Sequence, residues 1–250
     1  MKIYKQIIGA GLITLGSLGS TAQTAAKEVN TQEQGWFSIN STVRLTDKFA
    51  IVADVHVRRN DFLARDGFYF ARLGASYWIT KNLVATAGYA HMWVAPSKKS
   101  WEHFANEHRV YQQLQLNSGL GKVSMMQRFR NEQRWQEKIA EDQFTGKYKF
   151  TNRLRYLLSF TVPVFKNPQL PKVVVADELA IQFGKEIIYN TFDQNRIFLG
   201  VRQQVCKPLA FDFGYMQVYQ QKASGYQYDK NHTLRLFLYY TPDLRAKKQG

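Results

Sequence analysis

Apolar and polar side chains alternate along most of the chain that follows Gly35. In residues 153–162, every even-numbered position from Leu154 to Val162 is apolar. In residues 123–136 the even-numbered positions are instead mostly polar and include three arginines. A period of two places successive side chains on opposite faces of a β-strand, whereas a helix would distribute them around its circumference. The chain is therefore predicted to consist of strands with one apolar and one polar face.

The alternation predicts eleven strands, most of them ten residues or longer: 36–45, 48–59, 68–80, 83–94, 105–118, 122–136, 147–165, 172–184, 194–206, 209–222 and 229–241. Strands of soluble proteins are usually about five or six residues long, whereas strands that cross a membrane need about 9–11. Tight turns at 46–47, 80–82, 119–121 and 206–208 alternate with longer connections at 60–67, 95–104, 137–146, 185–193 and 223–228. Tight turns at one end and long loops at the other are typical of outer-membrane barrels.

The predicted fold is therefore all-β, a transmembrane antiparallel up-and-down barrel. Single-chain bacterial barrels usually have an even number of strands, and this rule favours about twelve strands over eleven. Three arrangements could reconcile twelve with the eleven readable strands. Residues 25–35 could add a short strand, the segment 147–165 could contain a break, or the N-terminal segment could pass through the lumen.

The N-terminus predicts the compartment. Lys2 and Lys5 precede an apolar stretch from Ile7 to Leu18, and small residues end the segment at Ala22. This is the pattern of a secretory signal peptide. We therefore expect a signal peptide over 1–22, a lead-in segment over 23–35, the barrel over 36–241 and a polar tail over 242–250. The expected location is the bacterial outer membrane, reached through the Sec pathway.

Composition excludes several other classes of protein. The 36 aromatic residues exclude a disordered chain, and the single cysteine excludes a disulfide framework. No run of about 18 apolar residues follows the signal segment, so a helical membrane protein is excluded as well. The net charge of +15, or +13 without the signal peptide, is compatible with nucleic-acid binding. However, the arginines are spread singly over many strands and form no single patch, so no nucleic-acid partner is expected.

If the apolar series faces lipid, the other series lines the lumen, and arginine dominates it. The basic candidates for an anion-binding lumen are Arg109, Arg128, Arg130, Arg134, Arg153, Arg155, Arg196 and Arg202, and the acidic partners are Glu107, Glu132, Glu178 and Asp212. The same series contains Arg44, Asp54, His56, Arg58, Arg72 and Arg235. These charges predict either an ion-pair lattice that braces the walls or a surface that binds or conducts anions.

Four polar blocks carry a family resemblance: EHRVYQQ at 107–113, QRFRNEQRW at 127–135, RLRY at 153–156 and FDQNR at 192–196. In order and spacing they resemble the outer-membrane barrel family known as domain of unknown function 2490. The resemblance covers most of the chain after the signal segment. It implies a bacterial outer-membrane β-barrel, and the family has no assigned activity that could be transferred.

Catalytic and metal motifs are absent from the sequence. None of the five histidines has a serine two residues later, as outer-membrane lipid hydrolases do, and neither a zinc motif nor an acidic calcium loop occurs. We expect no metal and no cofactor. Glu102 and His103, beside Trp101, are the most plausible acid–base pair if the barrel is an enzyme.

The first functional hypothesis is a non-enzymatic small channel or ligand-binding pore that prefers anions. The alternative is a structural barrel for envelope maintenance, with its lumen closed by Arg–Glu pairs, and a second alternative is a lipid-modifying enzyme. Expected partners are outer-membrane lipids and lipopolysaccharide, the barrel-assembly machinery during insertion and a small anionic solute. Lys98, Lys99 and the basic residues of 245–248 are candidates for contacts with lipid phosphates.

Overall fold

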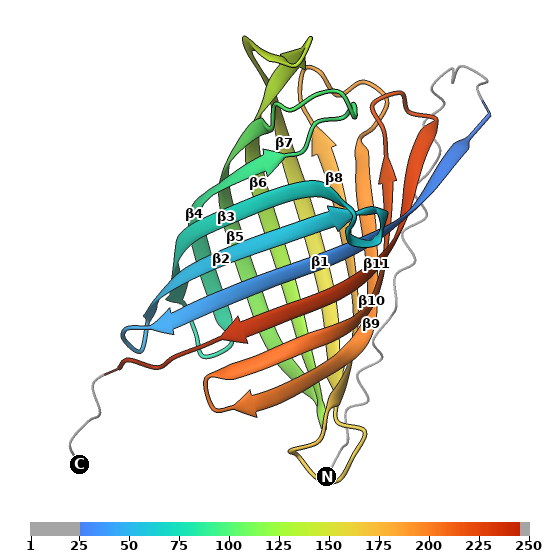
Figure 1. Cartoon of the computed structure of the whole chain (residues 1–250). Helices are drawn as coiled ribbons and strands as arrows, with labels where there is room; N and C mark the ends of the chain where they lie inside the picture. The colour runs from blue at the N-terminus through green and yellow to red at the C-terminus, as the bar shows by residue number, and fades with distance from the viewer. Residues whose placement is uncertain (1–25, 246–250) are drawn as a thin grey trace, which may run out of the picture.

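Eleven strands form one closed sheet in the computed structural model, which describes residues 26–245 (Figure 1). The elements are β1 (Glu28–Arg44), β2 (Phe49–Asn60), the short 3-10 helix η1 (Asp61–Leu63), β3 (Arg65–Trp78), β4 (Leu83–Val94), β5 (Ala105–Leu120), β6 (Val123–Ala140), β7 (Gln143–Val162), β8 (Lys172–Phe183), β9 (Phe192–Cys206), β10 (Leu209–Gln221) and β11 (Gln227–Tyr240). The predicted signal peptide and the last five residues of the predicted tail lie outside the described residues. Within residues 26–245, no helix is long and apolar enough to cross a membrane.

The barrel closes through a parallel pairing of its first and last strands, and the number of strands is eleven. Consecutive strands pair antiparallel, but β1 pairs with β11 in parallel, from Glu28 opposite Gln227 to Ser41 opposite Tyr240. The predicted barrel fold is confirmed with the eleven strands readable from the sequence, and the twelve favoured by parity are not present. Residues 28–35 add no separate strand but begin β1, and β7 runs without a break. An odd number is possible because the first and last strands run in the same direction.

Two connections differ from the prediction. Residues 137–146 were expected to form a long loop, but β6 and β7 continue to a tight turn at Glu141 and Asp142. Both turn residues have positive φ, 49° and 62°, which suits a two-residue hairpin. Conversely, β7 ends at Val162 rather than at 165, and a longer loop follows over 163–171. This loop contains three prolines, which lack the N–H group that a strand interior requires.

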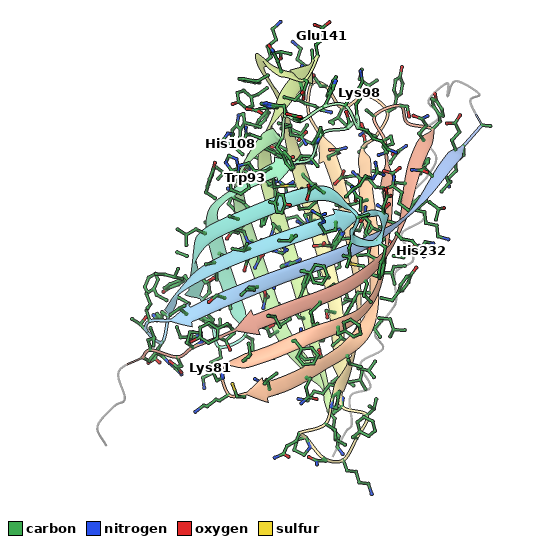
Figure 2. The ribbon with its side chains drawn as sticks, viewed as in Figure 1. Lys81, Trp93, Lys98, His108, Glu141 and His232 are labelled. Atoms are coloured by element: carbon green, nitrogen blue, oxygen red, sulfur yellow. The ribbon has the colours of Figure 1, made fainter. Side chains whose placement is uncertain are left out.

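The barrel has two distinct ends. The end that carries the turns at 45–48, 79–82, 121–122 and 207–208, the loop 163–171 and the C-terminal residues is called the short-turn end. The opposite end, called the loop end, carries the other connections and the start of β1. In Figure 2, Lys81 marks the short-turn end, and Lys98 and Glu141 mark the loop end.

The alternation separates the two faces of the sheet. Ile39, Leu73 and Leu199 point outward and are exposed, whereas Phe198, the neighbour of Leu199, is 2% exposed inside the barrel. Following the pairing once around the ring from Arg44 leads back to Asn30 in the same strand. Such a large offset means that the strands tilt strongly and enclose a wide interior.

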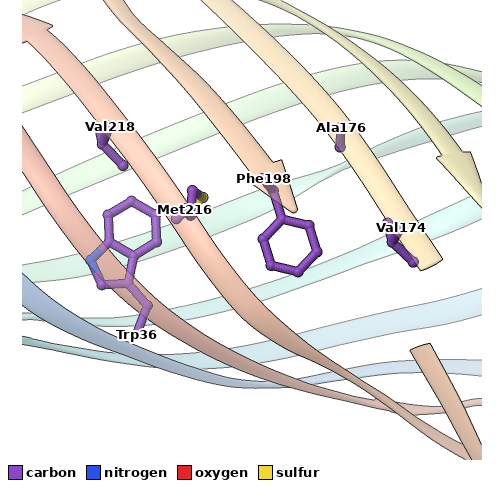
Figure 3. Packing of buried hydrophobic residues seen from close by; sticks show 6 residues of the cluster. All are labelled: Trp36, Val174, Ala176, Phe198, Met216 and Val218. Carbon is purple, nitrogen blue, oxygen red and sulfur yellow. The ribbon is translucent and has the colours of Figure 1, made fainter. Parts of the chain in front are cut away.

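Apolar packing fills one side of that interior. A cluster of buried residues from β1, β8, β9 and β10 projects into the lumen (Figure 3): Trp36, Val174, Ala176, Phe198, Met216 and Val218. A smaller buried apolar cluster, Phe70, Ala90 and Met92, lies inside the barrel on β3 and β4. Much of the remaining interior surface is polar and charged. The charged residues therefore have to be accommodated inside a barrel whose apolar core covers only part of the wall.

Candidate functional site

All twelve predicted lumen residues point into the barrel. Arg109, Arg128, Arg130, Arg134, Arg153, Arg155, Arg196, Arg202, Glu107, Glu178 and Asp212 line the interior cavity, and Glu132 is 3% exposed within the same network. We use the name arginine belt for the central group: Arg58, Arg72, Arg109, Arg128, Arg130, Arg134, Arg153, Arg155 and Arg196 with Asp54, Glu107, Glu132, Glu178 and Asp193. Of these, only Asp193 was missed in the sequence, because the β8–β9 register shifts there and the consecutive residues Asp193 and Gln194 are both buried, which breaks the alternation.

Glu132 lies at the centre of the belt. Its Oε2 accepts a hydrogen bond from Nε of Arg153 at 2.7 Å, and its Oε1 accepts one from Nη1 of Arg155 at 2.8 Å. Arg109 and Arg130 approach the same carboxylate at 3.9 and 3.7 Å. Four arginines from β5, β6 and β7 thus share one buried carboxylate.

Glu178 and Glu107 extend the network around the wall. Glu178 accepts hydrogen bonds from Arg155 at 2.6 Å, Arg128 at 2.7 Å and Arg196 at 3.2 Å. Arg155 therefore bridges Glu132 and Glu178. At the other side, Glu107 accepts hydrogen bonds at Oε1 from Nε of Arg134 at 2.7 Å and from Arg109, and Gln136 donates to Oε2.

A smaller ion-pair cluster lies nearer the short-turn end. Asp212, 1% exposed, accepts two hydrogen bonds from Arg202 at 2.6 and 2.8 Å. Tyr239 donates to the same carboxylate at 3.1 Å, and Arg235 lies 3.4 Å away. The two-point contact between Arg202 and Asp212 matches the planar geometry of both groups.

The belt contains more arginines than carboxylates. Arg58 forms no ion pair within the described residues and is stacked between Trp36 and Phe68, with its guanidinium carbon 3.3 and 4.2 Å from the ring centroids. Arg130 donates two hydrogen bonds to the neutral amide of Gln113, at 2.9 and 2.6 Å, and none to a carboxylate. Positive charge in the belt is thus only partly balanced by the carboxylates of residues 26–245.

His56 adds an unpaired donor to the same region. Both of its ring nitrogens are buried and lack a hydrogen-bond partner in the described part of the chain. The ring stands edge-on to Phe70 and Phe237, at centroid distances of 5.0 and 5.6 Å. His56, Arg58 and Arg130 all line one cavity.

That cavity has a volume of about 1180 Å³ and reaches from the short-turn end past the arginine belt to Val94 and Gln220 near the loop end. Near the short-turn end its wall includes Asn82, Gly119 and Lys207. We refer to the part of the cavity between the belt and the short-turn end as the vestibule.

The predicted acid–base pair at the loop end has other partners. The backbone N–H groups of Glu102 and His103 donate to the carboxylate of Asp142, at 3.0 and 2.8 Å, and these bonds lower the pKa of Asp142. His103 Nε2 lies 3.4 Å from Glu137 Oε2, so Glu137 rather than Glu102 is its carboxylate neighbour. These contacts dock the loop 95–104 against the β6–β7 hairpin.

The remaining histidines lie on the outer surface. His91 and His232 were expected to face outward, and both do: His91 Nε2 is 2.9 Å from Asn106 Oδ1, and His232 Nδ1 is 2.6 Å from the hydroxyl of Tyr215. Figure 2 marks His108 and His232 on the outside of the barrel. Among residues 26–245, no group of three or more histidine, cysteine or acidic side chains could hold a metal ion.

Comparison with known proteins supports the predicted family. No curated protein and no solved structure matches the chain. One family model does, described as protein of unknown function (DUF2490), and the match covers residues 33–231. The matched residues run from β1 into β11 and include the whole arginine belt. The chain, an eleven-stranded β-barrel with a buried Arg–Glu network, therefore belongs to the DUF2490 family.

Proposed function

We propose that this protein is a non-enzymatic outer-membrane barrel that binds a small anionic solute in its vestibule and does not conduct ions freely. The observation that carries the proposal is a cavity of about 1180 Å³ lined by arginines that outnumber the carboxylates around them. Arg58, Arg130 and His56, none of which donates a hydrogen bond to a carboxylate of the described residues, all belong to its wall.

The outward-facing surface supports a membrane location. Large apolar side chains such as Val55, Leu114 and Phe213 are exposed on the outside of the sheet. The strands are 12–20 residues long, which exceeds the length that a soluble sheet needs. Outer-membrane lipids and lipopolysaccharide are then the surrounding partners, and the barrel-assembly machinery would insert the chain.

Electrostatics supports an anionic ligand. Uncompensated positive charge on buried side chains is costly, and an anion from solution reduces that cost. Guanidinium groups keep their charge at all ordinary pH values and bind oxyanions through two parallel hydrogen bonds. A solute that carries a phosphate or carboxylate group is therefore favoured over a neutral one.

The ion-pair network argues against a permanently open pore. Arg155 links carboxylates from β6 and β8, and Arg153 links Glu132 to Asp193 at 3.0 Å. These contacts join the neighbouring strands β6, β7, β8 and β9 along the wall and fix the long arginine side chains in place at the level of the belt. We therefore favour the ligand-binding form of the first hypothesis over the channel form.

Two measurements test this proposal. Protein reconstituted in planar bilayers should give no steady single-channel conductance, and detergent-folded protein should bind sulfate in a calorimetric titration. Arg130→Gln should weaken sulfate binding about tenfold or more, since one charge-assisted hydrogen bond contributes about 1.5–3 kcal/mol. Lys81→Gln, which removes a positive charge at a turn, is the matched control and should leave binding unchanged. Stable anion-selective conductance would replace the binding proposal with a channel, and absent sulfate binding would refute it.

A structural role is the second candidate, and the network around Glu132 favours it. In that case the belt stabilises the barrel and binds no ligand, so sulfate would not bind, yet Glu132→Gln would lower the resistance to unfolding.

A lipid-modifying activity is the least supported candidate. It would require His103 and Glu137 to act as an acid–base pair, and loss of a lipid product in His103→Ala would be its signature.

A further inference from the structure

We infer that the anionic solute is an acidic saccharide, whose phosphate or carboxylate group binds at His56, Arg58 and Arg130 and whose hydroxyl groups bind along the vestibule wall. This inference rests on the proposed function and specifies its ligand. We call the three residues the anion site.

The anion site supplies donors that form no hydrogen bond with a carboxylate, although Arg130 lies 3.7 Å from Glu132. Within the described residues, neither Arg58 nor Arg130 donates to a carboxylate, and both ring nitrogens of His56 are unpaired. His56 and Arg58 lie two residues apart on β2, and all three residues line the same cavity. An oxyanion placed here would accept hydrogen bonds from several donors and would balance part of the excess charge.

The vestibule wall has a different chemistry. Between the belt and the short-turn end it presents hydroxyl and amide groups from four strands: Asn40, Thr42, Gln115, Asn117, Ser124 and Thr161. The hydroxyls of Thr42, Ser124 and Thr161 form no side-chain hydrogen bond with another described residue, and Ser124 lies opposite Thr161 on the neighbouring strand. Each hydroxyl both donates and accepts, as sugar hydroxyls do. A polyhydroxylated ligand would satisfy this wall, whereas a simple inorganic ion would leave it unused.

The wall and the anion site are continuous. Gln115 lies directly opposite Arg128 of the belt in the β5–β6 register. Phe237 also lines the cavity, with its ring centroid 5.6 Å from that of His56.

The size of the cavity points in the same direction. Small-molecule sites usually occupy roughly 300–1,000 Å³. The cavity of about 1180 Å³ is therefore large enough for an acidic saccharide of more than one ring. A single oxyanion would fill only a small fraction of it.

The test is a calorimetric titration of the detergent-folded full chain with two sets of probes. One set contains glucose 6-phosphate, glucuronate and a galacturonate trimer, and the reference set contains inorganic phosphate, acetate and glucose. At least one acidic saccharide should bind about tenfold tighter than the inorganic or simple anion with the same charged group, and glucose should bind weakest. The double variant Thr42→Val/Ser124→Ala should lose that preference but keep its affinity for phosphate. Ser41→Ala, which removes an outward hydroxyl of β1, is the control and should change neither.

The outcomes separate this inference from the proposed function. Phosphate that binds as tightly as every saccharide would overturn the saccharide inference and leave the anion site intact. Binding of no anion from either set would overturn both. Tighter binding of dodecyl phosphate than of any saccharide would identify an amphiphile as the ligand and would also overturn the saccharide inference.

Discussion

Nη1 of Arg155 donates a hydrogen bond to Oε1 of Glu132 at 2.8 Å, from β7 to the neighbouring strand β6. Nη2 of the same guanidinium donates to Glu178 on β8 at 2.6 Å. One side chain thereby connects three strands, and any slip in their register would break both bonds. The belt consequently contributes to the register of the sheet as well as to the charge of the lumen.

Replacing Glu132 by glutamine should destabilise the barrel strongly. The substitution leaves Arg153 and Arg155 without a shared counter-charge, and breaking a buried ion pair from one side costs about 3–5 kcal/mol. Urea unfolding of the folded protein, followed by tryptophan fluorescence, measures the change. Lys122→Gln, at the turn before the same strand, is the control and should change stability by less than about 0.5 kcal/mol. A similar stability for both variants would contradict the role assigned to the network.

Sulfate should stabilise the folded protein if the anion site binds it. A ligand that binds only the folded state adds about 2.7 kcal/mol at a hundred times its dissociation constant. The unfolding free energy should therefore rise with sulfate in the unmodified protein and rise much less in Arg130→Gln. Sodium chloride at equal ionic strength separates specific binding from screening. An equal rise in both proteins would show that sulfate acts elsewhere.

Acid should release the loop 95–104 from the β6–β7 hairpin. The N–H groups of Glu102 and His103 lower the pKa of Asp142 below its ordinary value of about 3.9. Asp142 therefore binds a proton less readily in the folded state than in the unfolded chain. Docking of the loop stabilises the protein above the ordinary pKa of Asp142, and this stabilisation is lost as the pH falls through the lowered pKa. A spin label at Ser100→Cys, in a Cys206→Ser background, should become mobile at acidic pH.

Asp142→Asn should remove this acid-induced step, because the side chain can no longer be protonated. Glu141→Gln, at the neighbouring turn position, should retain it. A step that persists unchanged in Asp142→Asn would mean that another group controls the loop.

Gly88→Ala should destabilise the wall next to the belt. A Cβ atom at Gly88 would lie 2.6 Å from the Cα of Gly74 on β3 and 2.8 Å from the hydroxyl of Tyr111. Forcing such contacts in a packed interior costs about 1–3 kcal/mol. Gly119→Ala is the control, since its Cβ would have a single neighbour, at 3.8 Å. Equal unfolding midpoints for the two variants would contradict the close approach of β3 and β4.

A disulfide should connect the first and last strands in parallel register. Ile39 and Leu238 are partners in the β1–β11 pair, so Ile39→Cys/Leu238→Cys should cross-link in a Cys206→Ser background. Non-reducing electrophoresis of the folded protein detects the product. Ile39→Cys/Leu234→Cys, offset along β11 by about 13 Å, should not cross-link. A cross-link in the second variant but not in the first would refute the parallel closure.

Local sequence predicted the strands well where alternation was uninterrupted. In β7, Leu154 and Tyr156 face outward while Arg153 and Arg155 are buried, as the period of two requires. The prediction was wrong where a turn depends on backbone conformation. Glu141 and Asp142 adopt positive φ, which a sequence without glycine at the turn does not reveal.

The ion pairs of the belt were predicted as a class but not as individual partners. Arg134 and Glu107 are 27 positions apart, and Arg128 and Glu178 are 50 apart. Which residues meet depends on the register of several strand pairs at once. The sequence also could not indicate that Arg58 would stack on Trp36 instead of pairing with a carboxylate.

The sequence by itself determined which side chains face inward and which face outward, because that choice depends only on the alternation within each strand. It also determined that the interior would be rich in arginine. Only the tertiary structure decided that eleven strands close through the parallel pair of β1 and β11, because the two ends of the chain must meet after ten antiparallel pairings. The same closure sets the tilt and the width of the lumen, and therefore which charges are paired and which remain free to bind a ligand.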